Sequence, residues 1–250
     1  EKEAVNPSQQ GTKAAAVYNL SIGAHASCTI QLRLSRSTPE SLSEATYEDF
    51  DQTLSRRKQD CDDFYASVMP AGLSAGQQLV FRQAMAGMLW SKQFYNYDIA
   101  PWLQQRGIDP LAGTSGENFR NQQWHHMNNC DVISMPDKWE YPWYAAWDLA
   151  FHTIPLALID PEFAKSQLRL FAREWFMHPN GQLPAYEWNF EDVNPPVHAW
   201  AGFRVYQMEK RKYGQGDVEF LEEIFSKMTI YFTWWVNRKG IDGDNLFSGG

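Results

Sequence analysis

One stretch, 138–152, most constrains what this chain can fold into. From residue 142 to residue 159 nearly every position is apolar, which predicts a helix buried on all sides. The polar exceptions include Tyr144, Asp148 and His152, which recur at every fourth position. On a helix these three side chains form one stripe along a single face. The sequence therefore predicts a polar stripe inside an otherwise apolar environment.

A carboxylate on such a helix needs a partner, because burying an unpaired charge is costly. A hydrogen bond from Asp148 to His152 or Tyr144 would make the stripe purely structural, whereas a polar ligand would make it functional. The tryptophans favour the functional interpretation, in which Asp148 binds a polar ligand, since seven of the eleven lie between residues 124 and 200. Flat aromatic faces beside carboxylates and amides suit a sugar ring, with its apolar C–H faces and its equator of hydroxyl groups. We therefore predict a carbohydrate site.

The composition excludes several classes of protein. With 250 residues and 44% hydrophobic residues, the chain can bury a full core in one large domain, or in one domain plus a small one. A formal net charge of −8 argues against a surface that binds nucleic acid. No apolar run is long enough to span a membrane, and no signal peptide is recognisable. We expect a carbohydrate partner, and neither nucleic acid nor membrane.

The ends of the chain and its cysteines bear on whether the chain is a fragment and on the redox environment of the protein. The chain begins with Glu-Lys-Glu and ends at 248–250 in what reads as a loop, so we expect a fragment of a longer protein. Cys28, Cys61 and Cys130 are odd in number and lack metal-ligand spacing, so we expect structural thiols. This cysteine usage favours a reducing, cytoplasmic location.

Residues 1–40 differ from the rest of the chain. Segments 17–23 and 28–34 alternate apolar and polar side chains around a glycine-containing turn, which predicts two antiparallel strands. Because two strands do not form a stable sheet alone, we expect them to be the last strands of a β-domain. Residues 35–43 are the expected linker.

From Thr46 onward the patterns predict helices almost exclusively. In the expected second helix, Leu79, Val80 and Phe94 are among the residues expected to face inward. Long loops are expected at 101–130 and 182–196. Helix pairs joined by alternating short and long loops are typical of a helical solenoid or toroid, whose ligand-binding loops gather at one mouth. The expected helices cover 50–68, 77–97, 142–159, 161–177, 196–213 and 218–238.

The loop at 182–196 holds a second group of candidate residues, with Glu187 directly before Trp188. Glycoside hydrolysis uses two carboxyl groups, and Asp148 with Glu187 is the obvious pair within this chain.

No metal and no cofactor is expected. The histidines at 125, 126, 152, 178 and 198 do not have zinc-motif spacing. The run Asp242-Gly-Asp-Asn resembles part of a calcium loop but lacks its terminal glutamate. The chain contains neither a phosphate-binding glycine-rich loop nor a G-x-S-x-G motif.

One pattern resembles a known family. The run Trp147-Asp148-Leu-Ala-Phe151-His152, followed by Asp160-Pro161, is similar to the Trp-Asp-x-x-Phe-His … Asp-Pro pattern of processing α-glucosidase I. That enzyme and its bacterial relatives, with mannosylglycerate-hydrolase-like enzymes among them, form glycoside hydrolase family 63. Segments 181–187 and 194–196 resemble the next segment of that family's sequence, and the resemblance is specific over 118–200. Trehalases share a Trp-Asp motif on the same scaffold.

The resemblance implies a mainly α fold. The N-terminal part of an (α/α)6 six-hairpin toroid would occupy 41–250, after the last strands of a β-sandwich domain in 1–40. It also implies an inverting α-glucosidase-type hydrolase for oligosaccharides or small α-glucosides. Asp148 and Glu187 fall on positions that line the subsite nearest the cleaved bond. The family's general acid and base would lie beyond Gly250, which conflicts with Asp148 and Glu187 as the acid–base pair, and we prefer the family placement.

Two rivals remain. One is a different reaction on the same toroid, such as trehalose hydrolysis or a lyase reaction, and the other is a sugar-binding protein without catalysis. The expected sugar-binding residues are Trp139, Tyr141, Trp143, Tyr144, Trp147, Asp148, His152, Glu187, Trp188, Arg120 and Asn121.

Overall fold

The chain divides into two units, residues 1–57 and 58–250. The computed structural model describes residues 5–8, 10–34, 36, 38–41, 49–109, 124, 127–141, 143–186, 190, 193–240 and 246–247.

The first unit contains little regular structure among its described residues. A 3-10 helix, η2 (Pro39–Ser41), precedes the start of a long helix. The predicted turn forms, since the Ala26 N–H donates to the Gly23 carbonyl at 3.1 Å. The predicted strands on either side do not form a ladder, and Val17 and Leu32 are 81% and 68% exposed. Alternation alone does not make a sheet, because each strand needs backbone partners and a covering layer. The β-sandwich stays a prediction.

Two helices come next. α1 (Phe50–Val68) has the predicted bounds, and the boundary between the units falls within it. α2 (Ala75–Trp90) starts at Ser74, whose Oγ accepts the Gln77 N–H while the Gln77 side chain accepts the Ser74 N–H. Within the second unit, Arg82 of α2 pairs with Asp62 of α1 at 2.5 Å.

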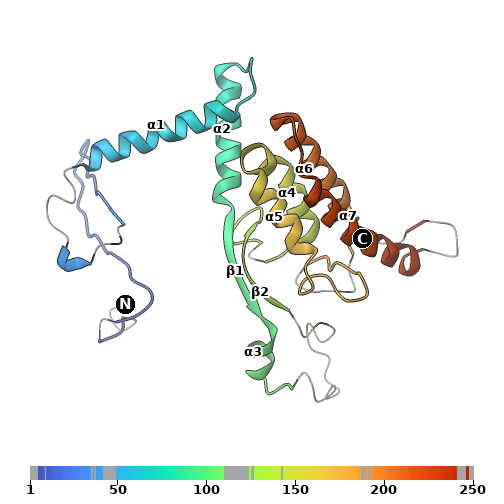
Figure 1. Cartoon of the computed structure of the whole chain (residues 1–250). Helices are drawn as coiled ribbons and strands as arrows, with labels where there is room; N and C mark the ends of the chain where they lie inside the picture. The colour runs from blue at the N-terminus through green and yellow to red at the C-terminus, as the bar shows by residue number, and fades with distance from the viewer. Residues whose placement is uncertain are drawn as a thin grey trace. The chain divides into compact units, whose positions relative to one another are not determined.

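The expected second helix is wrong in its last part. After Trp90 the chain forms β1 (Lys92–Asp98), which pairs antiparallel with β2 (Asn128–Ser134) as a two-stranded ribbon (Figure 1). A short helix, α3 (Ile99–Gln104), follows β1. The inward face expected for the second helix is wrong at Leu79 and Val80, which are 56% and 67% exposed, whereas Met88 of the same expected face packs against the core.

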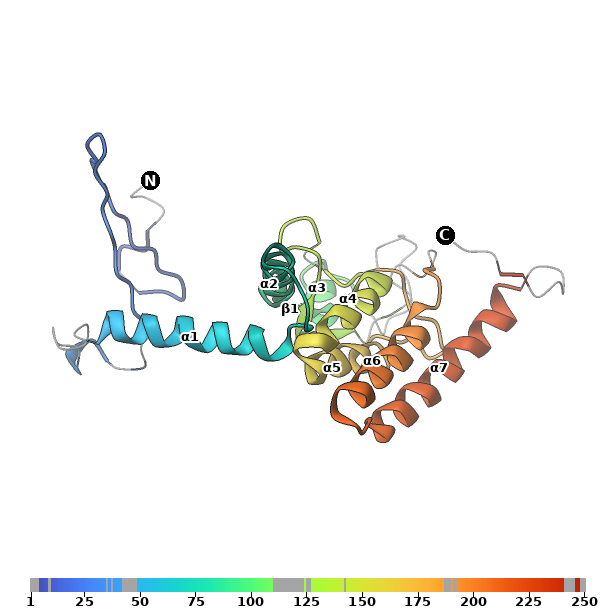
Figure 2. The ribbon, with the colours of Figure 1, turned by 90° about the horizontal axis from the view of Figure 1, so that it is seen from above.

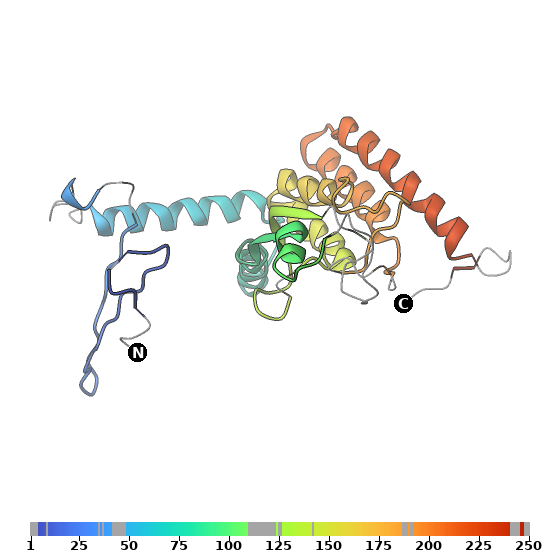
Figure 3. The ribbon, with the colours of Figure 1, turned by 90° about the horizontal axis from the view of Figure 1, so that it is seen from below.

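Four helices form the main body of the second unit. They are α4 (Ala146–Ile159), α5 (Pro161–Phe171), α6 (Val197–Tyr213) and α7 (Val218–Arg238). α4 packs against α5 and α6, and α6 packs against α7, so that two helical hairpins lie side by side (Figure 2). Figure 3 shows α6 and α7 together from the opposite side. The mainly α class is confirmed, and the closed toroid stays a prediction.

The helix ends follow their capping residues. The Asp160 and Asp217 side chains accept the N–H of Phe163 and Phe220, at 3.0 and 2.9 Å. α6 ends at Gly214, whose φ of 77° suits a residue without a Cβ. Two further predicted bounds shift by four residues or more, since α4 begins at residue 146 instead of 142 and α5 ends at residue 171 instead of 177.

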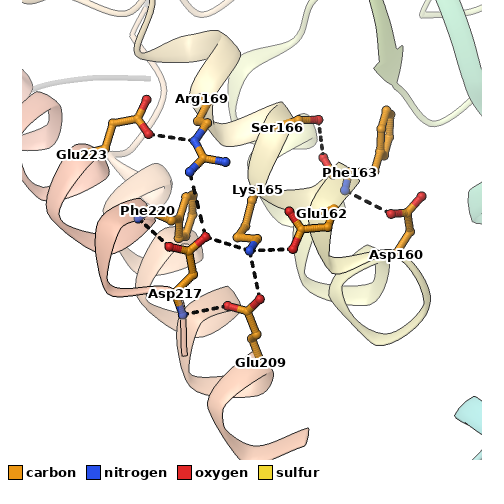
Figure 4. Close-up of polar contacts among 10 residues, drawn as sticks. All are labelled: Asp160, Glu162, Phe163, Lys165, Ser166, Arg169, Glu209, Asp217, Phe220 and Glu223. Atoms are coloured by element: carbon orange, nitrogen blue, oxygen red, sulfur yellow. Dashed lines mark hydrogen bonds and ion pairs between the residues drawn. The ribbon is translucent and has the colours of Figure 1, made fainter. Parts of the chain in front are cut away.

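One buried cation joins three helices (Figure 4). The Lys165 side chain is 3% exposed, and its Nζ lies 2.9 Å from Glu209 Oε1 and 2.8 Å from Asp217 Oδ2. A third carboxylate, that of Glu162, lies 2.7 Å away. Burial alone would lower the pKa of Lys165, but hydrogen bonds to the three carboxylates outweigh burial and raise it. The charged lysine therefore holds α5, α6 and the start of α7 together.

We expect Lys165→Met to lower the free energy of unfolding by about 3 kcal/mol, because it leaves the carboxylate of Glu209 buried without its cation. Urea unfolding measures this change. The matched control is Lys227→Met. The partner of Lys227, Glu174, is 76% exposed, so we expect the loss of this ion pair to cost less than about 1 kcal/mol. Equal losses in the two variants would contradict the role given to Lys165.

The same cluster predicts a pH dependence. The hydrogen bond from Lys165, followed by that from the Phe220 N–H, lowers the pKa of Asp217. A lowered folded-state pKa gives stability that is present above the ordinary aspartate pKa of about 3.9 and is lost as pH falls through the folded value. We expect the free energy of unfolding to fall below about pH 5, and to fall less steeply in Asp217→Asn. Urea unfolding at a series of pH values tests this, and identical slopes would refute it.

Candidate functional site

The start of α4 is closed by a distant segment of the chain. Ala145 occupies the N-cap position and has no side-chain acceptor to offer. Instead, the Ala146 N–H donates to the Ala185 carbonyl at 2.9 Å, and Ala145 forms an antiparallel bridge with Tyr186. The chain directly before Glu187 therefore lies beside the start of α4.

This loop packs closely on α7. Gly181 has a φ of 92°, and a Cβ at this position would lie 2.8 Å from the Ile230 carbonyl oxygen. Only glycine fits there without a shift. Farther along, the Gln182 side chain donates to the Phe190 carbonyl at 2.9 Å. These contacts hold residues 181–182 against α7 and tie residue 182 to residue 190.

α4 is not buried on all sides, contrary to the sequence prediction. Trp147 and Phe151 are 41% and 46% exposed, and Trp200 of α6 is 48% exposed. Their rings follow one another, with centroid distances of 6.1 Å from Trp147 to Phe151 and 5.9 Å from Phe151 to Trp200. An exposed aromatic row therefore crosses from α4 to α6.

Asp148 lies next to this row, in the first turn of α4. Its side chain is only partly buried, so water can solvate the carboxylate, and the helix N-terminus favours its negative charge. The sequence predicts a fully buried Asp148, which would require a partner within the protein. Because the carboxylate is only partly buried, it does not require one. No hydrogen bond reaches this carboxylate from the part of the chain that the structure describes, so its oxygens can accept from a ligand.

His152 lies one turn farther along α4. Its Nδ1 is 3.3 Å from the Ser134 hydroxyl of β2. Burial lowers the pKa of His152, although the negative charge of Asp148 acts in the opposite direction. The imidazole is therefore neutral at pH 7, with one ring nitrogen as a hydrogen-bond donor and the other as an acceptor.

Tyr144 does not belong to the stripe, and this corrects the prediction. It precedes α4 and is 1% exposed, with its ring 5.0 Å from Phe176, 5.3 Å from Tyr95 and 6.1 Å from Phe171. The hydroxyl meets no hydrogen-bond partner within the described residues. Burial raises the pKa of Tyr144. Tyr144 is part of the core. Because α4 begins only at residue 146, Tyr144 does not follow the helical spacing of Asp148 and His152, and its ring lies inward.

The aromatic loop before α4 is held by two residues that sequence reasoning missed. The Asp137 carboxylate accepts the N–H groups of residues 139–141 at 2.9, 2.5 and 3.4 Å. Gln93 of β1 donates to the carbonyls of Asp137 and Tyr141, each at 3.1 Å. Asp137 could have been found, because Asp after Pro is typical of such turns.

The loop presents its aromatic side chains differently. Trp139 is 83% exposed. The rings of Tyr141 and Trp143 lie 5.8 Å apart, and both residues are partly buried. The remaining predicted site residues, Arg120, Asn121, Glu187 and Trp188, lie outside the described residues.

The histidines and cysteines do not assemble a metal centre in the described ranges, where no three His, Cys, Asp or Glu side chains form a suitable group. Burial lowers the pKa of His198 to about 4, so this ring is neutral within the core. Cys28, Cys61 and Cys130 are free and exposed. No described helix combines the length and the apolar character needed to cross a membrane.

Comparison with known proteins shows which known domain part of this chain resembles. Residues 141–249 match the model of the mannosylglycerate hydrolase MGH1-like glycoside hydrolase domain, which supports a glycoside hydrolase family. The chain is also 47% identical, over 258 aligned residues, to the "Uncharacterized protein YMR196W" of Saccharomyces cerevisiae. That alignment covers 99% of this chain and 24% of the yeast protein, so the chain spans about a quarter of this relative. No solved structure matches the chain.

The position of Tyr144 predicts opposite results for two substitutions. Tyr144→Phe removes a buried hydroxyl without a described partner, so we expect the free energy of unfolding to stay the same or rise. Tyr144→Ala removes the ring from the core and is expected to cost about 3–5 kcal/mol. Thermal and urea unfolding measure both changes. A large loss in Tyr144→Phe would mean that the hydroxyl has a necessary partner.

Proposed function

We propose that this chain forms part of an inverting α-glucosidase-type glycoside hydrolase that acts on an oligosaccharide or a small α-glucoside. Trp147 and Asp148 line the sugar subsite nearest the cleaved bond. One observation carries the proposal: the segment that matches the glycoside hydrolase model contains an exposed tryptophan directly before a partly buried carboxylate. A sugar ring needs this combination of an apolar face and strong acceptors.

The chemistry of the site supports sugar binding. The indole of Trp147 offers a flat apolar surface to the C–H face of a pyranose, and Phe151 and Trp200 extend that surface. The Asp148 carboxylate can accept two hydroxyl hydrogen bonds, and bonds to an ionised acceptor are stronger than neutral ones. Glu187 would join the subsite, because the chain before it is bridged to Ala145 at the start of α4.

The helix packing supports the toroid. α4 and α6 lie next to each other, and each has a hairpin partner, α5 or α7. In a toroid, α4 and α6 would form the inner layer and α5 and α7 the outer one. The aromatic row of Trp147, Phe151 and Trp200 would then face the central axis, where the substrate binds.

In this proposal the residues described above bind the sugar, and the catalytic acid and base come from other segments of the protein. Inversion needs a general acid for the leaving oxygen and a general base for water, with the carboxyl groups about 6.5–9.5 Å apart. In this proposal both groups lie C-terminal to residue 250, as the family resemblance implies. Asp148 and Glu187 then hold sugar hydroxyls instead of transferring the reacting protons. Hydroxyl contacts that strengthen in the transition state contribute to kcat as well as to binding.

The test uses the full-length protein with a panel of α-glucosides, α-mannosides and trehalose. We expect hydrolysis of an α-glucoside, and a kcat/KM lower by roughly 10–100-fold in Asp148→Asn, because a charged acceptor is lost. The matched control is Asp62→Asn on α1, whose carboxylate pairs with Arg82 away from this site. Its kcat/KM should equal that of the unmodified protein.

The other outcomes separate the rivals. Cleavage of trehalose alone would favour a trehalase-like reaction. Sugar binding without any cleavage would favour a non-catalytic protein. Full activity in a folded Asp148→Asn protein would remove Asp148 from the site.

A further inference from the structure

The ribbon of β1 and β2 has one buried and one exposed face. Asn129 and Ile133 on one face are 2% and 0% exposed, whereas Phe94 and Val132 on the other face are 64% and 46% exposed. Asp98 and Asn128 are cross-strand partners at the last pair of the ladder, on this exposed face. Side chains of such a pair lie about 5 Å apart at Cβ. An acceptor carboxylate and an amide therefore stand next to each other.

This pair lines a hollow of about 630 Å³. Across from the ribbon, the hollow is bounded by the turn after α5, which contributes Glu174 and Trp175. A second hollow of about 260 Å³ shares Asn128 and Trp175 with the first and adds Arg173. The two hollows, called the trough below, share these two lining residues, and the volume of the first falls within the range of ligand pockets. Trp124 and Met127 complete the wall of the first hollow.

The turn that carries Trp175 is fixed from several sides. The Trp124 indole N–H donates to the Trp175 carbonyl at 2.6 Å. Arg173 lies 3.6 Å from Asp131 of β2, and Glu174 lies 3.3 Å from Lys227 of α7. The Trp175 indole is nevertheless 46% exposed. A binding surface held in place before the ligand arrives loses less entropy on binding.

We propose that this trough is a second carbohydrate-binding site, which takes a neutral oligosaccharide with one sugar ring stacked on Trp175. Asp98, Asn128 and Arg173 supply acceptors and donors for the hydroxyl groups around the ring. The Oδ1 atom of Asp98 accepts the Ala100 N–H at 3.0 Å, which orients the carboxylate. Asn128 can donate and accept at once, as a sugar hydroxyl does. None of the residues that line the two hollows belongs to the aromatic row on α4 and α6, and binding here needs no bond cleavage.

The alternative ligand is an organic cation, since aromatic rings beside carboxylates also bind quaternary ammonium groups. Such sites are cages of several exposed ring faces. Here Trp124 is only 5% exposed, so Trp175 acts as a single platform. Arg173 and the Asn128 amide add N–H donors, which a cation cannot use. A lining with mixed donors and acceptors fits neutral sugar rings better.

The experiment measures oligosaccharide binding by isothermal titration calorimetry in the Trp147→Ala protein, so that stacking on α4 does not contribute. Maltoheptaose and a linear mannan heptasaccharide are the probes. We expect binding to persist, and Kd to rise at least about tenfold when Trp175→Ala is added. Adding Trp90→Ala, which truncates a 78% exposed tryptophan on α2, should change Kd less than about twofold.

The result that overturns the proposal is an unchanged Kd with Trp175→Ala, or no binding of either probe to the Trp147→Ala protein. Tetramethylammonium binding that depends on Trp175 would assign the trough to cations instead. If Trp175→Ala does not fold, Trp175→Phe and Asn128→Ala replace it. Phe should retain part of the affinity, and Asn128→Ala should weaken binding. Loss of hydrolysis in Asp148→Asn does not bear on this site, so the two proposals fail independently.

Discussion

The hydrogen bond from the Ala146 N–H to the Ala185 carbonyl determines where the candidate site lies. A helix start without a capping side chain must satisfy its N–H groups in another way. Here a segment about 40 residues away in sequence does so, and it draws the loop of Tyr186 against the first turn of α4. Asp148 and the chain leading to Glu187 meet because of this contact. The rest of the site depends on it.

Helix ends with strong local signals could be predicted from the sequence. Asp160, Asp217 and Gly214 mark their helix ends by short-range chemistry, and the structure confirms each of them. α1 and α7 also have the predicted bounds. Such signals involve residues within one helical turn, so no knowledge of tertiary contacts is needed. The mainly helical class follows from these elements together.

Features that depend on distant partners could not be predicted in the same way. The strand from Lys92 to Asp98 follows α2 without a glycine or proline, and its partner begins 30 residues later. The stripe of Tyr144, Asp148 and His152 assumed a helix from residue 142, but the helix begins at residue 146. Tyr144 therefore turns into the core. Asp148 and His152 keep their helical spacing, because both lie within α4.

Hydropathy also misjudged which apolar residues are buried. The apolar run predicted a helix buried on all sides, yet Phe151 and Trp147, the latter an expected sugar-binding residue, lie exposed beside a carboxylate. Leaving such rings in water costs free energy that folding would otherwise gain, so a large exposed aromatic row indicates a surface used for binding. Trp175 is also exposed, on a turn that is held by the hydrogen bond from the Trp124 indole N–H. The aromatic row and the supported turn of Trp175 therefore differ from single exposed apolar side chains, which are normal on protein surfaces.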